Sequence, residues 1–189
     1  MPRLKVLLAV TTYPLPSRSY DELVCTAGLL EDGSWIRIYP IPLSFLIDLK
    51  QSGKVNNVKY TWIELELTKR KDDFRPESYS PRYYDFRDIT IHSPRLTTAG
   101  NWQQRKEYCL KNVYTNFETL LSDSKAPTNI SLATFKPAAI TGFEWEADER
   151  EWKDEWVEIR KQTDLFNQGT IKKKKMIPKV PYKFFYKFT

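Results

Sequence analysis

The sequence predicts a β-rich protein of the α+β class, and three observations lead to this prediction. Several short runs alternate between apolar and polar residues, which is the period of a half-buried strand. Prolines and turn dipeptides separate these runs. Only one stretch, in the middle of the chain, changes to the spacing of a long helix. Because strands and helices do not alternate along the chain, a doubly wound parallel sheet is not expected.

The first half of the chain holds most of the predicted strands. Asp32-Gly33 is a turn dipeptide between two β-like runs and therefore predicts a hairpin. Gly28, inside the first of these runs, indicates a bulge or a close approach of another backbone. The apolar segment 43–49 fits a helical turn or a loop packed on the end of a barrel. The predicted strands are residues 4–10, 23–30, 35–39, 60–68 and 86–92.

The second half of the chain begins with the predicted long helix, over residues 101–122. Cys109, Val113, Phe117 and Leu120 recur at the spacing of one helical face. A short acidic helix is expected around Trp152, Trp156 and Ile159, and strands are expected at residues 130–135, 139–146 and 182–188.

The composition excludes several classes of protein. The longest apolar runs of the 189-residue chain are far below the roughly 18 residues that span a membrane. Its two cysteines cannot make a disulfide framework, and it holds a single histidine, His92. The Gly-rich phosphate loops of nucleotide-binding enzymes are absent from the sequence. We therefore expect a soluble cytoplasmic protein without a membrane partner, and we expect no cofactor.

The net charge of +6 is unevenly distributed. Residues 172–189 hold seven lysines and no acid, whereas residues 144–158 hold eight acids and two bases. The rest of the chain is mildly basic. Basic segments attract polyanions, so Lys172, Lys173, Lys174 and Lys175 are candidates for nucleic-acid binding. The alternative is that these lysines form an ordinary solvated loop.

One strand places aromatic and basic side chains on the same face. Trp35, Arg37 and Tyr39 share a face because side chains alternate along a strand, and Ile36 and Ile38 point the other way. Such a row can stack on bases and pair with phosphates. The alternative is that a helix or a partner covers these aromatics.

The polar segment 71–79 is the second candidate binding element. Arg75 could bind an anion while Glu77 orients its guanidinium, and Tyr79 is a further candidate for nucleic-acid binding. In the alternative interpretation, the loop satisfies its own charges, with Arg75 paired to Asp72 or Glu77.

Catalytic chemistry has little support in the sequence. A metal-dependent nuclease needs clustered carboxylates with a lysine, and Glu64, Glu66 and Lys69 match that pattern poorly. Cys25 and Cys109 lie in apolar or amphipathic segments and are expected in the core. We therefore predict no catalytic residue and no metal ligand, and the chain is expected not to be an enzyme.

Three stretches of the sequence are similar to a known family. They are VCTAGLLEDGSWIRIYPIP at 24–42, KDDFRPESY at 71–79 and VPYKFFYKF at 180–188. In these stretches the chain resembles the dual OB-fold domain family, bacterial proteins with two OB-like barrels that occur alongside prokaryotic conflict or defence components. The resemblance implies one barrel in residues 1–98, and the long helix plus a second barrel, whether complete or incomplete, in residues 99–189. A partner chain could complete the edge left by the last strand.

The resemblance also implies a function. We expect a non-catalytic protein that binds nucleic acid, single-stranded or guide-type, as an accessory of a prokaryotic, defence-related assembly. The main alternative is a protein-interaction subunit whose aromatic and acidic surfaces dock a partner. A metal-dependent nuclease is a lesser alternative.

Overall fold

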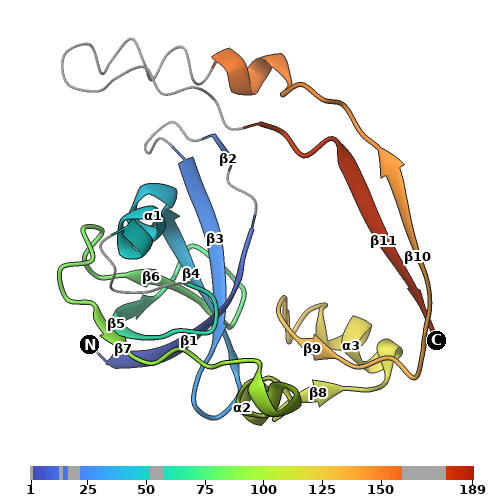
Figure 1. The fold of residues 1–189 in the computed structure, drawn as a ribbon, viewed down its shortest axis with the longest axis horizontal. Helices are drawn as coiled ribbons and strands as arrows, with labels where there is room; N and C mark the ends of the chain where they lie inside the picture. The colour runs from blue at the N-terminus through green and yellow to red at the C-terminus, as the bar shows by residue number, and fades with distance from the viewer. Residues whose placement is uncertain (1, 13–14, 17–21, 52–57, 159–177) are drawn as a thin grey trace. The chain divides into compact units, whose positions relative to one another are not determined.

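The computed structural model describes residues 2–12, 15–16, 22–51, 58–158 and 178–189 (Figure 1). The chain divides into two compact units. The first unit holds residues 1–13 and 24–136, and the second holds residues 14–23 and 137–189. The expected domain boundary at residues 98 and 99 lies within the first unit.

The first unit is built on a closed barrel of five strands. In chain order these strands are β1 (Arg3–Thr11), β3 (Glu22–Leu29), β4 (Trp35–Pro42), β5 (Trp62–Lys69) and β6 (Ser78–Pro81). Around the barrel the order is β1-β3-β4-β6-β5, and β5 pairs with β1 to close it. The β4–β6 pair is parallel, whereas β1–β3, β1–β5 and β5–β6 are antiparallel. The short strand β7 (Thr90–His92) extends the sheet beside β5. The short strand β2 (Leu15–Pro16) pairs with Glu22 and Leu23 at the start of β3, and these paired residues belong to the second unit. A five-stranded barrel with this strand order, in which β4 pairs with β6 and not with β5, is compatible with an OB fold.

Alternate side chains of the strands fill the barrel. Ile36 and Ile38 of β4 and Leu65 of β5 are all at most 1% exposed, as the alternation in the sequence predicts. Helix α1 (Leu43–Gln51) lies at one end of the barrel (Figure 1). Its Leu46 joins the core, and the neighbouring Phe45 stacks on Phe86 with ring centroids 3.9 Å apart. The segment after β4 is therefore helical and closes the barrel.

Two glycines act in the barrel as the sequence indicates. A Cβ atom on Gly28 would lie 2.5 Å from the carbonyl oxygen of Leu7 on β1. Only glycine therefore fits at this point of the β1–β3 pair. The register of β1 and β3 shifts one step further on, between Leu8 and Val10. Gly33 has a φ of 83°, which suits its place in the β3–β4 turn.

The long helix predicted over residues 101–122 is not formed. The chain instead makes α2 (Ala99–Cys109), β8 (Val113–Tyr114) and α3 (Phe117–Asp123). Between the helices, the Lys111 side chain donates to the Glu31 carbonyl at 2.6 Å, and β8 pairs in parallel with β9 (Thr134–Phe135). Asn116 caps α3 by accepting from the Thr119 amide at 2.9 Å. The contact of Lys111 with the β3–β4 turn and the pairing of β8 with β9 therefore outweigh the helical spacing of the sequence.

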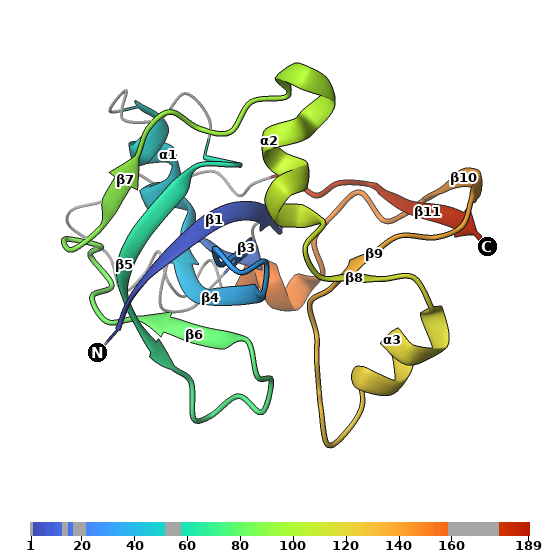
Figure 2. The ribbon, with the colours of Figure 1, turned by 90° about the horizontal axis from the view of Figure 1, so that it is seen from below.

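Helix α2 covers a second cluster outside the barrel interior. Trp62 of β5 is 7% exposed and packs with Leu7 and Leu29. The ring of Tyr108 from α2 meets the Trp62 ring edge-on, with centroids 4.9 Å apart. Figure 2 shows α2 beside β1. The outer face of β5 is thus buried at Trp62 by the chain's own helix.

In the second unit, β10 (Ile140–Ala147) and β11 (Tyr182–Phe188) form an antiparallel pair. In a closed barrel every strand has two neighbours, and within the described residues each of these strands has one. A second barrel is therefore not shown in this part of the chain. Residues 154–158 are helical, as expected for the acidic segment. None of the described helices is long and apolar enough to cross a membrane.

Candidate nucleic-acid interface

The row predicted on β4 exists, but it is half-buried. Trp35, Arg37 and Tyr39 point away from the barrel interior that Ile36 and Ile38 occupy. All three outward side chains have intermediate exposure, so the row is not the open platform that the sequence predicts.

A segment of the same unit, residues 131–134, lies over one half of the row. Arg37 donates from its guanidinium to the Ser131 hydroxyl at 2.8 Å, and the Trp35 indole N–H donates to the Thr134 hydroxyl at 3.2 Å. Glu77, which is 7% exposed, accepts hydrogen bonds from the backbone N–H and the hydroxyl of Ser131. This covering segment is thus held by a buried carboxylate and by two members of the row.

The Tyr39 end of the row meets the loop between β5 and β6, residues 70–77. The guanidinium of Arg70 lies 5.3 Å from the centre of the Tyr39 ring, a cation–π distance. The same guanidinium pairs with Asp72 at 2.6 Å. No hydrogen bond from the covering segment to Tyr39 is found among the described residues. This end of the face is therefore the one that a ligand could approach.

The loop satisfies part of its charge internally. Arg75 donates to both carboxylate oxygens of Asp73, at 2.8 and 2.6 Å. Hydrogen bonding from Arg75 holds the pKa of the Asp73 carboxyl well below its usual value. The expected partners, Asp72 and Glu77, are instead paired with Arg70 and Ser131. Arg75 is therefore an organising residue of the loop, with about a third of its side chain exposed.

Phe74 is the residue of this loop that our sequence analysis missed. It is 79% exposed, although an apolar ring of this size is ordinarily buried. The cations Lys69, Arg70, Lys71 and Arg75 surround it in sequence. Lys69 is tied to the loop, because its ammonium donates to the Arg75 carbonyl at 3.0 Å and to the Pro76 carbonyl. A single aromatic residue within a charged loop was the available signal.

The remaining predicted binding residues do not join the row. Tyr79 pairs in register with Ile38 on the parallel strand β4 and packs against the barrel core, so it lies on the inner side of the sheet. The Lys69 ammonium lies 5.2 Å from its ring centre. Lys172 to Lys175 fall outside the described residues.

The carboxylates considered for a nuclease are engaged with cations. Glu64 accepts from Arg3 and contacts His92, both at 3.1 Å, and these hydrogen bonds lower the pKa of its carboxyl. Glu66 pairs with Arg82 at 2.5 Å. In the described part of the chain, no group of three metal-ligating side chains is found. Burial raises the pKa of the Cys109 thiol, which opposes a nucleophilic role.

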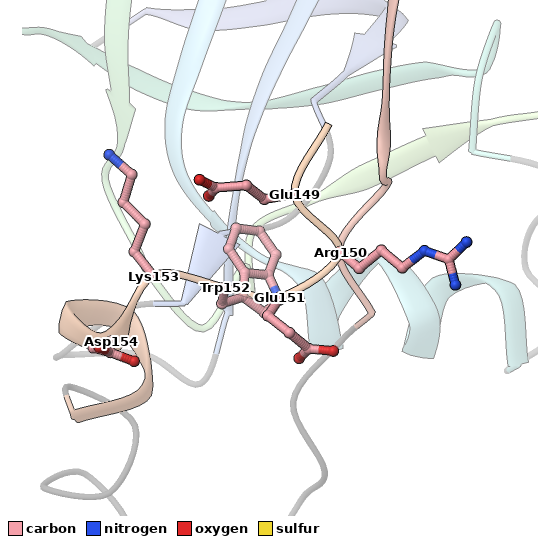
Figure 3. Close-up of a pocket in the computed structure, with 6 residues that line it drawn as sticks. All are labelled: Glu149, Arg150, Glu151, Trp152, Lys153 and Asp154. Atoms are coloured by element: carbon pink, nitrogen blue, oxygen red, sulfur yellow. The ribbon is translucent and has the colours of Figure 1, made fainter. Parts of the chain in front are cut away.

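The acidic segment of the second unit surrounds a hollow (Figure 3). Six consecutive residues line it, from Glu149 to Asp154. The Trp152 ring lies between the side chains of Glu149 and Glu151, and Arg150 and Lys153 point to opposite sides. The two cations offset part of the negative charge, and the hollow holds no cluster of carboxylates that would define a cation site.

The fold and these surfaces define a class: a β-rich protein built on a five-stranded barrel, compatible with an OB fold, with an aromatic and basic row on one strand. The chain belongs to the family described as Domain of unknown function (DUF8758), which matches residues 2–111. A second family, described as Domain of unknown function (DUF8757), matches residues 97–189, so the two ranges overlap where the domain boundary was expected. No curated protein and no solved structure matches the sequence.

Proposed function

We propose that this protein binds single-stranded nucleic acid, without catalysis, at the end of the barrel formed by Tyr39 and the loop 70–77. The supporting observation is the exposed ring of Phe74, which lies in a loop rich in cations. The same loop meets Tyr39, because its Arg70 lies over the Tyr39 ring. OB folds bind oligonucleotides on the barrel face of their second and third strands and with adjoining loops, including the one between the fourth and fifth strands. Here these elements are β3, β4 and the loop 70–77.

The chemistry of this end suits a flexible polyanion. An exposed aromatic ring stacks on any base, and such stacking is worth about 1–3 kcal/mol per base. Lys71 is exposed and supplies positive charge for a phosphate. Arg70 and Arg75 are already paired with aspartates, so they would contribute chiefly by shaping the loop. We therefore expect modest affinity and little sequence preference.

Fluorescence anisotropy with labelled poly(dT) and poly(U) oligonucleotides, over a series of salt concentrations, tests this proposal. Phe74→Ala should weaken binding by about 5- to 150-fold, the equivalent of one lost base stack. Lys71→Ala should lower the slope of log affinity against log salt by about 0.7. Phe185→Ala is a matched control, since this exposed phenylalanine lies in the second unit.

Three results would overturn the proposal: no binding at low salt, an affinity that does not respond to salt, or equal losses for Phe74→Ala and Phe185→Ala. The comparison of poly(dT) with poly(U) also distinguishes DNA from RNA as the preferred ligand, because only RNA carries a 2′-hydroxyl group.

The wider setting follows from the resemblance and belongs to the same proposal. The protein would act in the cytoplasm as an accessory of a prokaryotic, defence-related assembly. Lys172 to Lys175 would add to the electrostatic attraction. A second OB-like barrel would require strands besides β10 and β11.

A protein-interaction subunit is the second candidate function, and one observation favours it. The second unit exposes an unusual number of aromatic side chains on β10 and β11, including Trp145 at 61% and Tyr186 at 65%. Large exposed apolar patches mark protein-interaction sites.

A further inference from the structure

The ribbon of β10 and β11 has one apolar face and one charged face. Residues that lie opposite each other in an antiparallel pair point to the same side. Phe143 lies opposite Tyr186, and Trp145 lies opposite Phe184. The apolar face consists of Ile140, Phe143, Trp145, Ala147, Tyr182, Phe184, Tyr186 and Phe188.

Ring contacts confirm that these aromatics share a face. The Phe143 and Tyr186 centroids are 5.1 Å apart, and those of Trp145 and Tyr182 are 5.4 Å apart. The apolar side chains nevertheless remain open, with exposures from 40% at Phe188 to 66% at Ile140. Aromatic pairs of this kind add stability, but here they leave about half of the aromatic surface in water.

The opposite face carries the charges of the ribbon. Lys187 pairs with Glu144, its close neighbour across the ribbon. The ammonium of Lys183 lies 3.9 Å from the carboxylate of Asp148. The apolar face holds no cation, so it lacks the charge that a phosphate backbone requires. It also holds no anion, so two such faces can meet without repulsion between like charges.

A two-stranded ribbon is at best marginally stable in water and needs a third layer or further strands. The six aromatic side chains of the apolar face, at roughly 200 Å² each and about half exposed, offer about 600 Å² for burial. Ile140 adds to this area. Stable interfaces bury roughly 600–1,000 Å² per partner, so one copy of this face supplies the area that a dimer needs.

We propose that the apolar face of the β10–β11 ribbon is the interface of a homodimer, formed with the same face of a second copy of this chain. Two ribbons packed face to face would make a four-stranded sandwich about 10 Å thick, with the charged faces outside. A two-fold axis uses the same patch on both copies and closes the assembly at two. The inference does not depend on nucleic-acid binding, since its residues lie outside the barrel.

Sedimentation velocity of the nuclease-treated full chain, over a wide range of concentration, tests the proposal. The mass should rise from 22.4 kDa at low concentration to twice that value at high concentration. Phe184→Asp should raise the dimer dissociation constant by at least about tenfold, because it places a charge in the centre of the interface. Phe185→Asp is the matched control, since its ring is similarly exposed but lies on the charged face.

Every outcome decides the proposal. A monomer at all concentrations overturns it, and so does a dimer that Phe184→Asp leaves intact, which would use the ribbon edges instead. Equal dissociation by both variants, or growth into higher oligomers, overturns it as well. If Phe184→Asp fails to fold, a wild-type melting temperature that does not rise with protein concentration still overturns the proposal, since a dimer requires that rise.

Discussion

Strands β5 and β11 have similar alternating sequences and opposite surroundings. In β5, Ile63, Leu65 and Leu67 are at most 2% exposed. In β11, Tyr182 and Phe184 are 42% and 56% exposed. The barrel supplies β5 with paired strands on both sides and a filled interior, whereas within the described residues β11 has one neighbour. Alternation therefore specifies which residues share a face, and the neighbouring layer decides whether that face is buried.

The comparison predicts a large difference between two truncations. Leu65→Ala should destabilise the barrel by about 2–5 kcal/mol, because the removed side chain would leave a cavity in a closed core. Phe184→Ala should change the unfolding free energy by no more than about 0.5 kcal/mol at concentrations where the chain is monomeric. Urea unfolding followed by circular dichroism measures both. Similar losses for the two variants would show that the ribbon face is buried within the monomer.

Two strand glycines sharpen the same contrast. Gly28→Ala should cost about 1–3 kcal/mol or more, because the new methyl group would meet the Leu7 carbonyl oxygen at 2.5 Å. Gly142→Ala, in β10, should be nearly neutral, since its closest contact would be an ordinary 3.7 Å to Lys187. Thermal unfolding of both variants tests this. A neutral Gly28→Ala would mean that β1 and β3 separate more easily than their register indicates.

A smaller effect is expected where the covering segment meets the barrel. Ser131→Ala removes the acceptor of Arg37 and a donor to the buried Glu77, and should cost about 1–3 kcal/mol. Ser124→Ala is the control, because that hydroxyl makes an exposed hydrogen bond to a backbone carbonyl. Hydrogen exchange should quicken in residues 131–136 of the first variant alone. Unchanged exchange there would contradict the anchoring role of Glu77.

The smallest expected effect is the pH response of the loop 70–77. The pKa of Asp73 is lowered in the folded protein, so its pairing with Arg75 stabilises the loop above the ordinary value of 3.8. That contribution is lost as the pH falls below 3.8 toward the folded pKa. In Arg75→Ala, NMR titration should return the Asp73 pKa toward 3.8. An unchanged Asp73 pKa in this variant would assign the shift to other groups in the loop.

Parts of the barrel could be predicted from local signals in the sequence. The alternating strands, the turn at Gly33 and the close approach at Gly28 all depend on neighbouring residues or on backbone geometry. Strand β6 could not be predicted in this way, because a four-residue strand that ends in a proline carries no clear period. The strand exists only by pairing with β4 and β5. The broken helix has a similar origin, since β8 forms by pairing with β9, some twenty residues further along the chain.

The candidate site divides along the same line. By itself the sequence determined that Trp35, Arg37 and Tyr39 lie on one face, because a strand permits no other arrangement. Only the tertiary structure decided that Ser131 and Thr134 cover half of this face, that Arg75 pairs with Asp73, and that Phe74 stays exposed. Local geometry follows from the covalent chain, whereas burial and ion pairing depend on which distant segments arrive beside a residue.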